Sequence, residues 1–122
     1  MNKSIGIAVA LLGLCAASVR AESAYATESF TVTTATQSFT AAYLVGNTSP
    51  GAYVDTEKMY AFLTLETADM RYCVDGSSPT PVTCHKMASG TSLKIIGQED
   101  LKKFHFMRDG GSNALLQVTY FR

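Results

Sequence analysis

The sequence predicts an all-β domain, a small antiparallel β-sandwich or jelly-roll-like barrel of about eight short strands. Three observations favour this fold class. Turn-forming residues recur about every ten residues, apolar and polar side chains alternate between the turns, and no segment after residue 21 keeps a helical period for more than roughly ten residues. A chain of 122 residues is also too short for two ordinary domains, so we expect one.

Residues 1–21 have the order of a secretory signal peptide. Lys3 gives a basic start, residues 5–14 are apolar, and Val19 and Ala21 place aliphatic or small side chains before a cut after Ala21. The apolar run is shorter than the roughly 20 residues that a membrane-spanning helix needs. We therefore expect a cleaved signal and a secreted or periplasmic protein. A buried N-terminal helix is one alternative, and a lipid anchor at Cys15 is another.

Removal of the signal leaves residues 22–122 with a nearly balanced charge. Lys3 and Arg20 leave with the signal, so eight of the ten basic residues remain against ten acidic ones. No run of Lys or Arg appears, and a nucleic-acid partner is not expected because binding to phosphates needs clustered positive charge. A domain of this size has a thin margin of stability, which a covalent crosslink would improve.

Cys73 and Cys84 are the two cysteines left after signal cleavage, and we predict a disulfide between them. The ten residues between them are rich in turn formers and should reverse the chain. The turn motif consists of Asp75, Gly76, Pro79 and Thr80. Two unpaired thiols are the alternative. A metal site at Cys84, His85 and His105 is disfavoured because the spacing matches no common ligand pattern.

Residues 22–40 form a Ser/Thr-rich N-terminal arm or edge strand, and residues 41–122 are assigned to the β-sandwich domain. The alternation in residues 29–36 suits an exposed edge strand, and residues 40–45 suit a second strand. The arm offers few large apolar side chains. We therefore predict that it is an interaction element outside the core, with a flexible leader as the alternative.

The remaining strands follow from alternation and from the turns between them. They are predicted at 59–65, 69–74, 92–96, 104–108 and 114–121, with a loop at 46–51, a helical turn at 98–103 and a hairpin loop at 109–113. The apolar faces of these strands predict a core that contains Phe62, Leu65, Tyr72, Ile95, Phe106, Leu116 and Val118.

No set of nucleophile, base and orienting group stands out, so an enzyme is not expected. His85 and His105 are read as surface or half-buried side chains. Neither a cofactor site nor a metal site is predicted. The Asp75-Gly76-Ser77 segment is too short a motif to indicate calcium. Tyr25 and Tyr53 lie in polar, loop-like sequence and are the candidate ligand-facing rings for a carbohydrate.

Residues 61–121 contain an ordered series of short motifs. They are Ala-Phe-Leu-Thr-Leu-Glu at 61–66, Arg-Tyr at 71–72, Asp-Gly-Ser-Ser-Pro-Thr at 75–80, Gly-Thr-Ser-Leu at 90–93, Gln-Glu-Asp-Leu at 98–101, Phe-His-Phe-Met-Arg at 104–108 and Gln-Val-Thr-Tyr at 117–120. This series resembles a small β-sandwich family of tailed-phage and prophage virion structural proteins, often called head decoration proteins. The Tyr-x-x-Asp-Gly-Ser-x-Pro-Thr pattern at 72–80 also resembles the sandwich appended to chitobiases and other secreted glycosidases.

The virion resemblance implies a β-sandwich that docks onto a capsid. The signal peptide and the cysteine pair depart from that family, because capsid proteins assemble in a reducing cytoplasm. We therefore expect an exported, non-enzymatic structural or assembly module that docks by edge strands or loops onto a larger protein surface or onto itself. The alternative is a secreted carbohydrate-binding or adhesive domain. A small secreted enzyme or inhibitor has no residue set to support it.

Overall fold

The computed structural model describes residues 22–45 and 58–122 of the chain. The predicted signal peptide, the loop at 46–51 and Tyr53 lie outside the described residues. The elements, in chain order, are β1 (Ala24–Val32), β2 (Gln37–Ser38), a 3₁₀ helix (Ala41–Tyr43), β3 (Tyr60–Glu66), β4 (Met70–Cys73), β5 (His85–Met87), β6 (Ser92–Ile96), α1 (Gln98–Lys103), β7 (His105–Arg108) and β8 (Ala114–Phe121).

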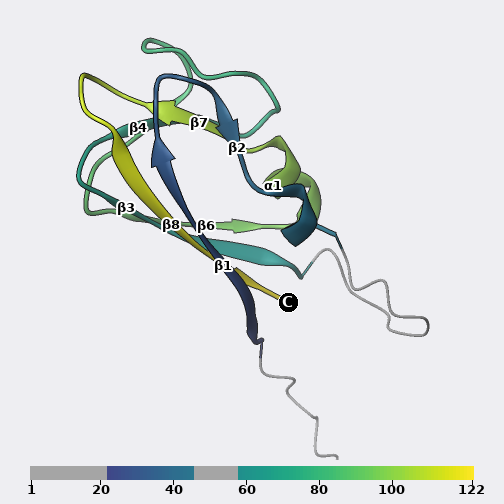
Figure 1. Cartoon of the computed structure of the whole chain (residues 1–122). Coiled ribbons are helices and arrows are strands. Elements are labelled where there is room, and N and C mark those ends of the chain that lie inside the picture. Colours follow the sequence, from purple (N-terminus) through teal and green to yellow (C-terminus); the bar gives the residue numbers. More distant parts are fainter. Residues whose placement is uncertain (1–21, 46–57) are drawn as a thin grey trace, which may run out of the picture.

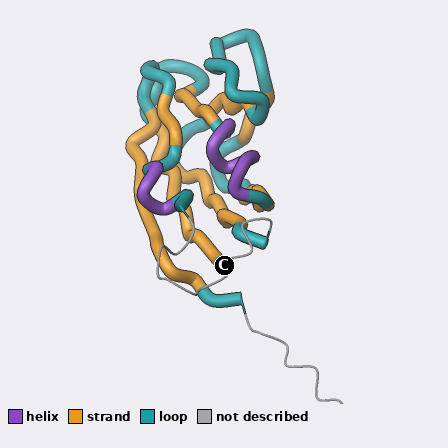
Figure 2. Tube along the Cα trace, turned by 90° about the vertical axis from the view of Figure 1, so that its right-hand side faces the viewer, coloured by secondary structure: helices purple, strands orange, loops and turns teal. Residues whose placement is uncertain are grey.

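The strands form two four-stranded sheets, which confirms the predicted all-β antiparallel sandwich. The first, sheet A, has the order β1-β8-β3-β6, and the second, sheet B, has the order β2-β7-β4-β5. All the strand pairs are antiparallel. In Figure 1, β1 and β8 run side by side in sheet A, and Figure 2 shows the two short helical segments in purple against the strands.

Alternation along β8 shows how the sequence builds the core. Ala114, Leu116, Val118 and Tyr120 are buried, whereas the residues between them are half-exposed. Side chains of successive strand residues point to opposite faces, so the buried set faces sheet B. The prediction of this inward face is confirmed, and Leu65, Ile95 and Phe106 are buried as well.

Two residues of the predicted core are not fully buried. Tyr72 is half-buried, and Phe62 lies outside the core. Phe62 is 42% exposed because Ala61, Leu63 and Leu65 take the inward face of β3. Three apolar residues in a row leave the choice of face open, and the pairing of Phe62 with Lys94 and Thr119 places it on the outer face of sheet A.

The N-terminal arm contributes to the core, so the prediction that it lies outside the core is wrong. β1 is an edge strand of sheet A, but Val32 at its end is completely buried. Phe39 is 4% exposed, and its ring packs against those of Phe30, Phe104, Phe106 and Tyr120. A few large rings are therefore enough to build this polar segment into a small core.

Two other local predictions need correction. Residues 41–43 form a 3₁₀ helix in place of the predicted strand. Residues 109–113 do not close a hairpin, because β7 belongs to sheet B and β8 to sheet A, so this turn carries the chain across the sandwich. The predicted helical turn is present as α1, where Leu101 is buried and where acidic residues begin and basic residues end the helix.

Candidate functional site

A sheet edge with unpaired amides can take up a strand from another chain, and this sandwich has four such edges. β2 and β5 are the edges of sheet B, with two and three residues. β1 and β6 are the edges of sheet A, with nine and five residues. Short edge strands offer few amides, which leaves β1 and β6 as the edges that another strand could use.

β1 carries three features that protect an edge. Its pairing with β8 has a bulge between Ala24 and Ala26. Glu28 points inward, where its carboxylate accepts hydrogen bonds from the Tyr120 hydroxyl and from the Thr40 backbone N–H and hydroxyl. The Gln37 side chain donates to the carbonyl of Thr31, at 3.2 Å. Bulges and inward charges are devices that disfavour edge pairing, so this edge is closed.

β6 turns a regular row of backbone groups away from β3. The Gly97 N–H donates to Met59 O at 2.7 Å, and the Leu65 N–H donates to Thr91 O at 3.0 Å, so the odd-numbered residues face β3. Antiparallel pairing alternates these directions, and the N–H and C=O groups of Ser92, Lys94 and Ile96 therefore point away from β3. In the described part of the chain, no strand pairs with that side of β6.

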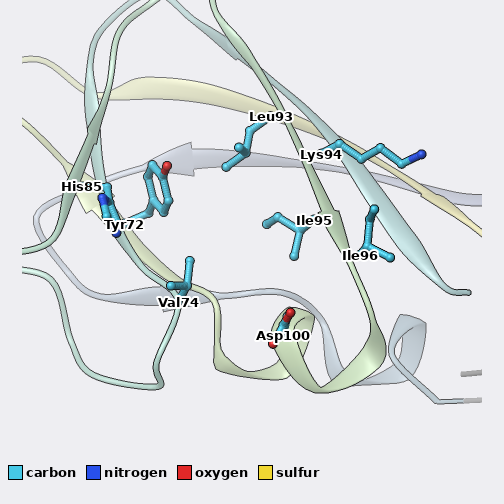
Figure 3. A pocket seen from close by; sticks show the side chains of 8 residues that line it. All are labelled: Tyr72, Val74, His85, Leu93, Lys94, Ile95, Ile96 and Asp100. Atoms are coloured by element: carbon cyan, nitrogen blue, oxygen red, sulfur yellow. The ribbon is translucent and has the colours of Figure 1, made fainter. Parts of the chain in front are cut away.

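An apolar groove of about 420 Å³ runs beside β6, between the open edges of the two sheets. Figure 3 shows Leu93 and Ile95 on one wall and Tyr72 with His85 on the other. Its lining is completed by Val74, Lys94, Ile96 and Asp100. A cleft of this size holds several side chains, and its mostly apolar lining favours apolar ones.

The outer face of sheet A next to β6 is also unusually apolar. Ile96 is 57% exposed and Phe62 is 42% exposed. The rings of Tyr60 and Phe121 stack at 4.6 Å, and the Lys94 ammonium lies 3.8 Å from the centre of the Tyr60 ring. β6 therefore has exposed apolar side chains on its outer face and the apolar groove on its inner face, and we call its outward side, from Ser92 to Ile96, the docking edge.

The Cys73–Cys84 disulfide is present, with a Cα–Cα distance of 5.2 Å, and this prediction is confirmed. It closes the loop between β4 and β5, which pair as a hairpin. The four turn-motif residues lie in this loop. The Asp75 carboxylate accepts from the backbone N–H and hydroxyl of Ser77, which lowers the pKa of Asp75, and the Gly76 N–H donates to Lys103 O.

The tip of the disulfide loop is a separate exposed feature. Pro79 is buried, and Thr80 and Thr83 bond each other through their hydroxyls at 2.7 Å. Between them Val82 is 85% exposed. The loop is thus tied at several points, and its first residue, Val74, forms part of the groove wall.

Ion pairs on sheet B lie apart from the groove lining. Lys86 bridges the carboxylates of Asp69 and Asp109, at 3.1 Å each. These contacts raise the pKa of Lys86 and lower the pKa of Asp109. The pKa of Asp69 is also lowered, chiefly by the hydrogen bond from the Ser89 N–H. The described residues contain no group of three or more His, Cys, Asp or Glu side chains that could hold a metal ion. None of the helices in the described ranges is long and apolar enough to cross a membrane.

Comparisons with protein families, curated proteins and solved structures found no match. The candidate site therefore rests on the geometry of the chain itself.

Tyr25 does not offer an open ring. It is half-buried against Tyr120, its hydroxyl donates to Tyr43 O at 2.5 Å, and the Arg122 guanidinium lies 4.2 Å from the ring centre. Burial raises the pKa of Tyr25. Its sequence neighbourhood is polar because β1 is an edge strand, and not because the ring faces solvent.

The histidines have separate positions. His85 lies against the Tyr72 ring, with 5.3 Å between ring centres, and lines the groove. His105 is half-exposed on β7, and its Nδ1 lies 3.2 Å from Ser77 O in the disulfide loop. Cys84 is in the disulfide, so these three side chains do not form a metal site together.

The sequence predicts β6 as a strand but does not identify it as a sheet edge beside a groove. The available signal is the Ser-Leu-Lys-Ile-Ile pattern of β6. Strict alternation would place a polar residue at position 96, but the chain has Ile96 there, on the exposed face. The groove was not predictable, because it depends on which two strands end at the same side of the sandwich.

Proposed function

We propose that this chain is an exported, non-enzymatic assembly module that docks onto a larger protein surface by adding a partner strand to β6. The single observation that carries the proposal is the docking edge, where the amides of Ser92, Lys94 and Ile96 point away from β3, pair with no strand of the described residues and lie beside an apolar groove. In strand addition, backbone hydrogen bonds supply affinity and pockets for alternate side chains supply specificity. β6 offers both.

Three further features support the proposal. The disulfide suits an oxidising compartment, as expected for a secreted or periplasmic protein. Within the described residues, the closed β1 edge leaves β6 as the open side of sheet A, so that docking would have a defined direction. A two-fold pairing of two copies centred on Lys94 would place like charges opposite each other, which favours a different protein as the partner. A capsid-like surface, implied by the virion resemblance, is one such partner.

The test compares two variants at one position. Lys94→Pro removes an outward N–H and none of the bonds to β3, and Pro is tolerated on an edge strand in this orientation. Lys94→Ala removes the charge and keeps the N–H. A photo-crosslinking residue at Ile96 of the exported protein should give one defined protein adduct, which Lys94→Pro abolishes and Lys94→Ala keeps.

The control carries the same photo-crosslinking residue at Thr27, on the closed edge, and should give no adduct. Circular dichroism and thermal unfolding of both Lys94 variants must match the parent protein. Equal crosslinking of the parent and Lys94→Pro would contradict docking through β6.

A carbohydrate-binding domain is the second candidate, favoured by the aromatic side chains on the outer face of sheet A. Tyr60, Phe62 and Phe121 gather there in neighbouring strands. Sugar stacking needs a free ring face, but Phe121 and Lys94 each pack against the Tyr60 ring, which leaves mainly Phe62. Retention on insoluble chitin or cellulose that Phe62→Ala abolishes would favour this function over protein docking.

A further inference from the structure

The charged side chains at and near the groove differ in whether they have a partner. The Lys94 ammonium is engaged over the Tyr60 ring, on the outer face of sheet A. Glu99, the residue before Asp100 in α1, is paired with Lys102 at 3.0 Å. Asp100 lines the groove, and no basic group of the described residues lies within ion-pair distance of its carboxylate.

We propose that the segment which adds to β6 carries a basic side chain that pairs with Asp100. This inference rests on the proposed function and names the chemistry of the partner. The groove presents one uncompensated carboxylate at the end of an apolar surface, and its charge complement is a Lys or Arg at the end of an apolar strand.

The register of an added strand places that basic residue. Side chains opposite Leu93 and Ile95 would point into the groove, because directly paired residues share a face of the sheet. α1 begins at Gln98, one residue after Gly97, so a segment that continues past Ile96 comes to Asp100. The expected partner motif is therefore one basic residue followed by two apolar residues at alternate positions, with polar residues between.

The direction of the added strand follows from the antiparallel pairing in both sheets. All the described strand pairs are antiparallel, and an added antiparallel strand would begin where β6 ends. The basic residue then lies at the N-terminal end of the partner segment. A solvent-accessible ion pair of this kind should change affinity by about two- to fivefold.

The test uses two end-capped synthetic peptides, Lys-Thr-Val-Thr-Val-Thr and the same peptide with Glu in place of Lys. Binding to the protein is measured by chemical-shift titration of the β6 amides at low ionic strength. We expect the Lys peptide to bind about two- to fivefold more tightly than the Glu peptide. Asp100→Asn should remove this preference.

Glu99→Gln is the matched control, because it makes the same change in net charge at the neighbouring residue. It should keep the preference for Lys, which separates a pair with Asp100 from general attraction to an acidic protein. A preference that survives Asp100→Asn, or that Glu99→Gln also removes, overturns the inference.

The remaining outcomes are also decisive. Equal binding of both peptides, abolished by Lys94→Pro, would contradict the basic residue and leave strand addition intact. No shift of the β6 amides with either peptide contradicts the inferred motif, and the crosslinking experiment then judges the proposed function separately. A concentration-dependent dimer in sedimentation, with β6 amides unaffected by peptide, would identify a second copy as the occupant and overturn the inference.

Discussion

The two edges of sheet A differ in what lies beside them. β1 has nine residues and many polar side chains, yet a bulge, the inward Glu28 and the Gln37 side chain close it. β6 has five residues and, among the described residues, neither a bulge nor an inward charge; it carries Lys94 on its outer face and adjoins an apolar groove. Length and polarity therefore do not identify the edge that is free to bind. What covers the edge decides it.

The two sides of sheet A also differ in how completely their apolar side chains are buried. The β1 side is completed by Phe39, whose ring contacts four other aromatic rings, whereas on the β6 side Ile96 is 57% exposed and Phe62, on the neighbouring strand β3, is 42% exposed. Burial stabilises the closed side. The open side keeps apolar surface that an added strand would cover. Because this surface is also in water in the unfolded chain, its exposure changes the free energy of unfolding of the monomer little.

Truncation on each side should give the largest contrast. Phe39→Ala should lower the free energy of unfolding by about 3–5 kcal/mol, because it removes a buried ring at the centre of the aromatic cluster. Phe62→Ala should cost about 1 kcal/mol or less, because the side chain lies on the outer face of sheet A and is 42% exposed. Urea unfolding of both variants checks the contrast, and similar losses would mean that the two sides are equally buried.

Removal of the disulfide should have the next largest effect. Replacement of Cys73 and Cys84 by Ser should cost about 2–4 kcal/mol, because the crosslink restricts the unfolded chain. It should also make the groove wall at Val74 more mobile, which would reduce the contrast between the β6 edge and the β1 edge. Denaturant unfolding of the Ser variant measures the loss, and intact mass before and after reduction and alkylation verifies the bond in the parent. Two free thiols in exported material would contradict the assignment.

The sequence was sufficient for the fold class, the disulfide and the inward face of β8, because alternation, turn residues and cysteine number are local signals. Phe62 and the N-terminal arm could not be placed the same way. The face taken by Phe62 depends on its neighbours in β6 and β8, and the burial of Phe39 depends on rings far away in the chain. The groove is likewise a property of how the two sheets meet.

A smaller effect is expected at the hydrogen bond that closes β1. Burial, and then the bond to Glu28, raise the pKa of Tyr120. The folded state therefore keeps this proton after the unfolded state begins to lose it, so the stabilisation is complete below the ordinary pKa of 10.0 and is lost as pH rises above it.

Tyr120→Phe should lower stability near neutral pH by about 1 kcal/mol. It should also make the free energy of unfolding fall less steeply above pH 10 than in the parent. Urea unfolding at neutral and alkaline pH checks both expectations. An alkaline slope that Tyr120→Phe does not change would mean that Tyr120 does not titrate differently in the folded state.

Hydrogen exchange of the β6 amides in the isolated monomer tests the central claim most directly. The amides of Lys94 and Ile96 should exchange much faster than those of Leu93 and Ile95, which bond to β3, so that protection alternates along the strand. NMR-detected exchange on the monomeric protein resolves these residues individually. Equal, high protection of all four amides would show that another part of the chain already covers β6, and would contradict an edge that is free to dock.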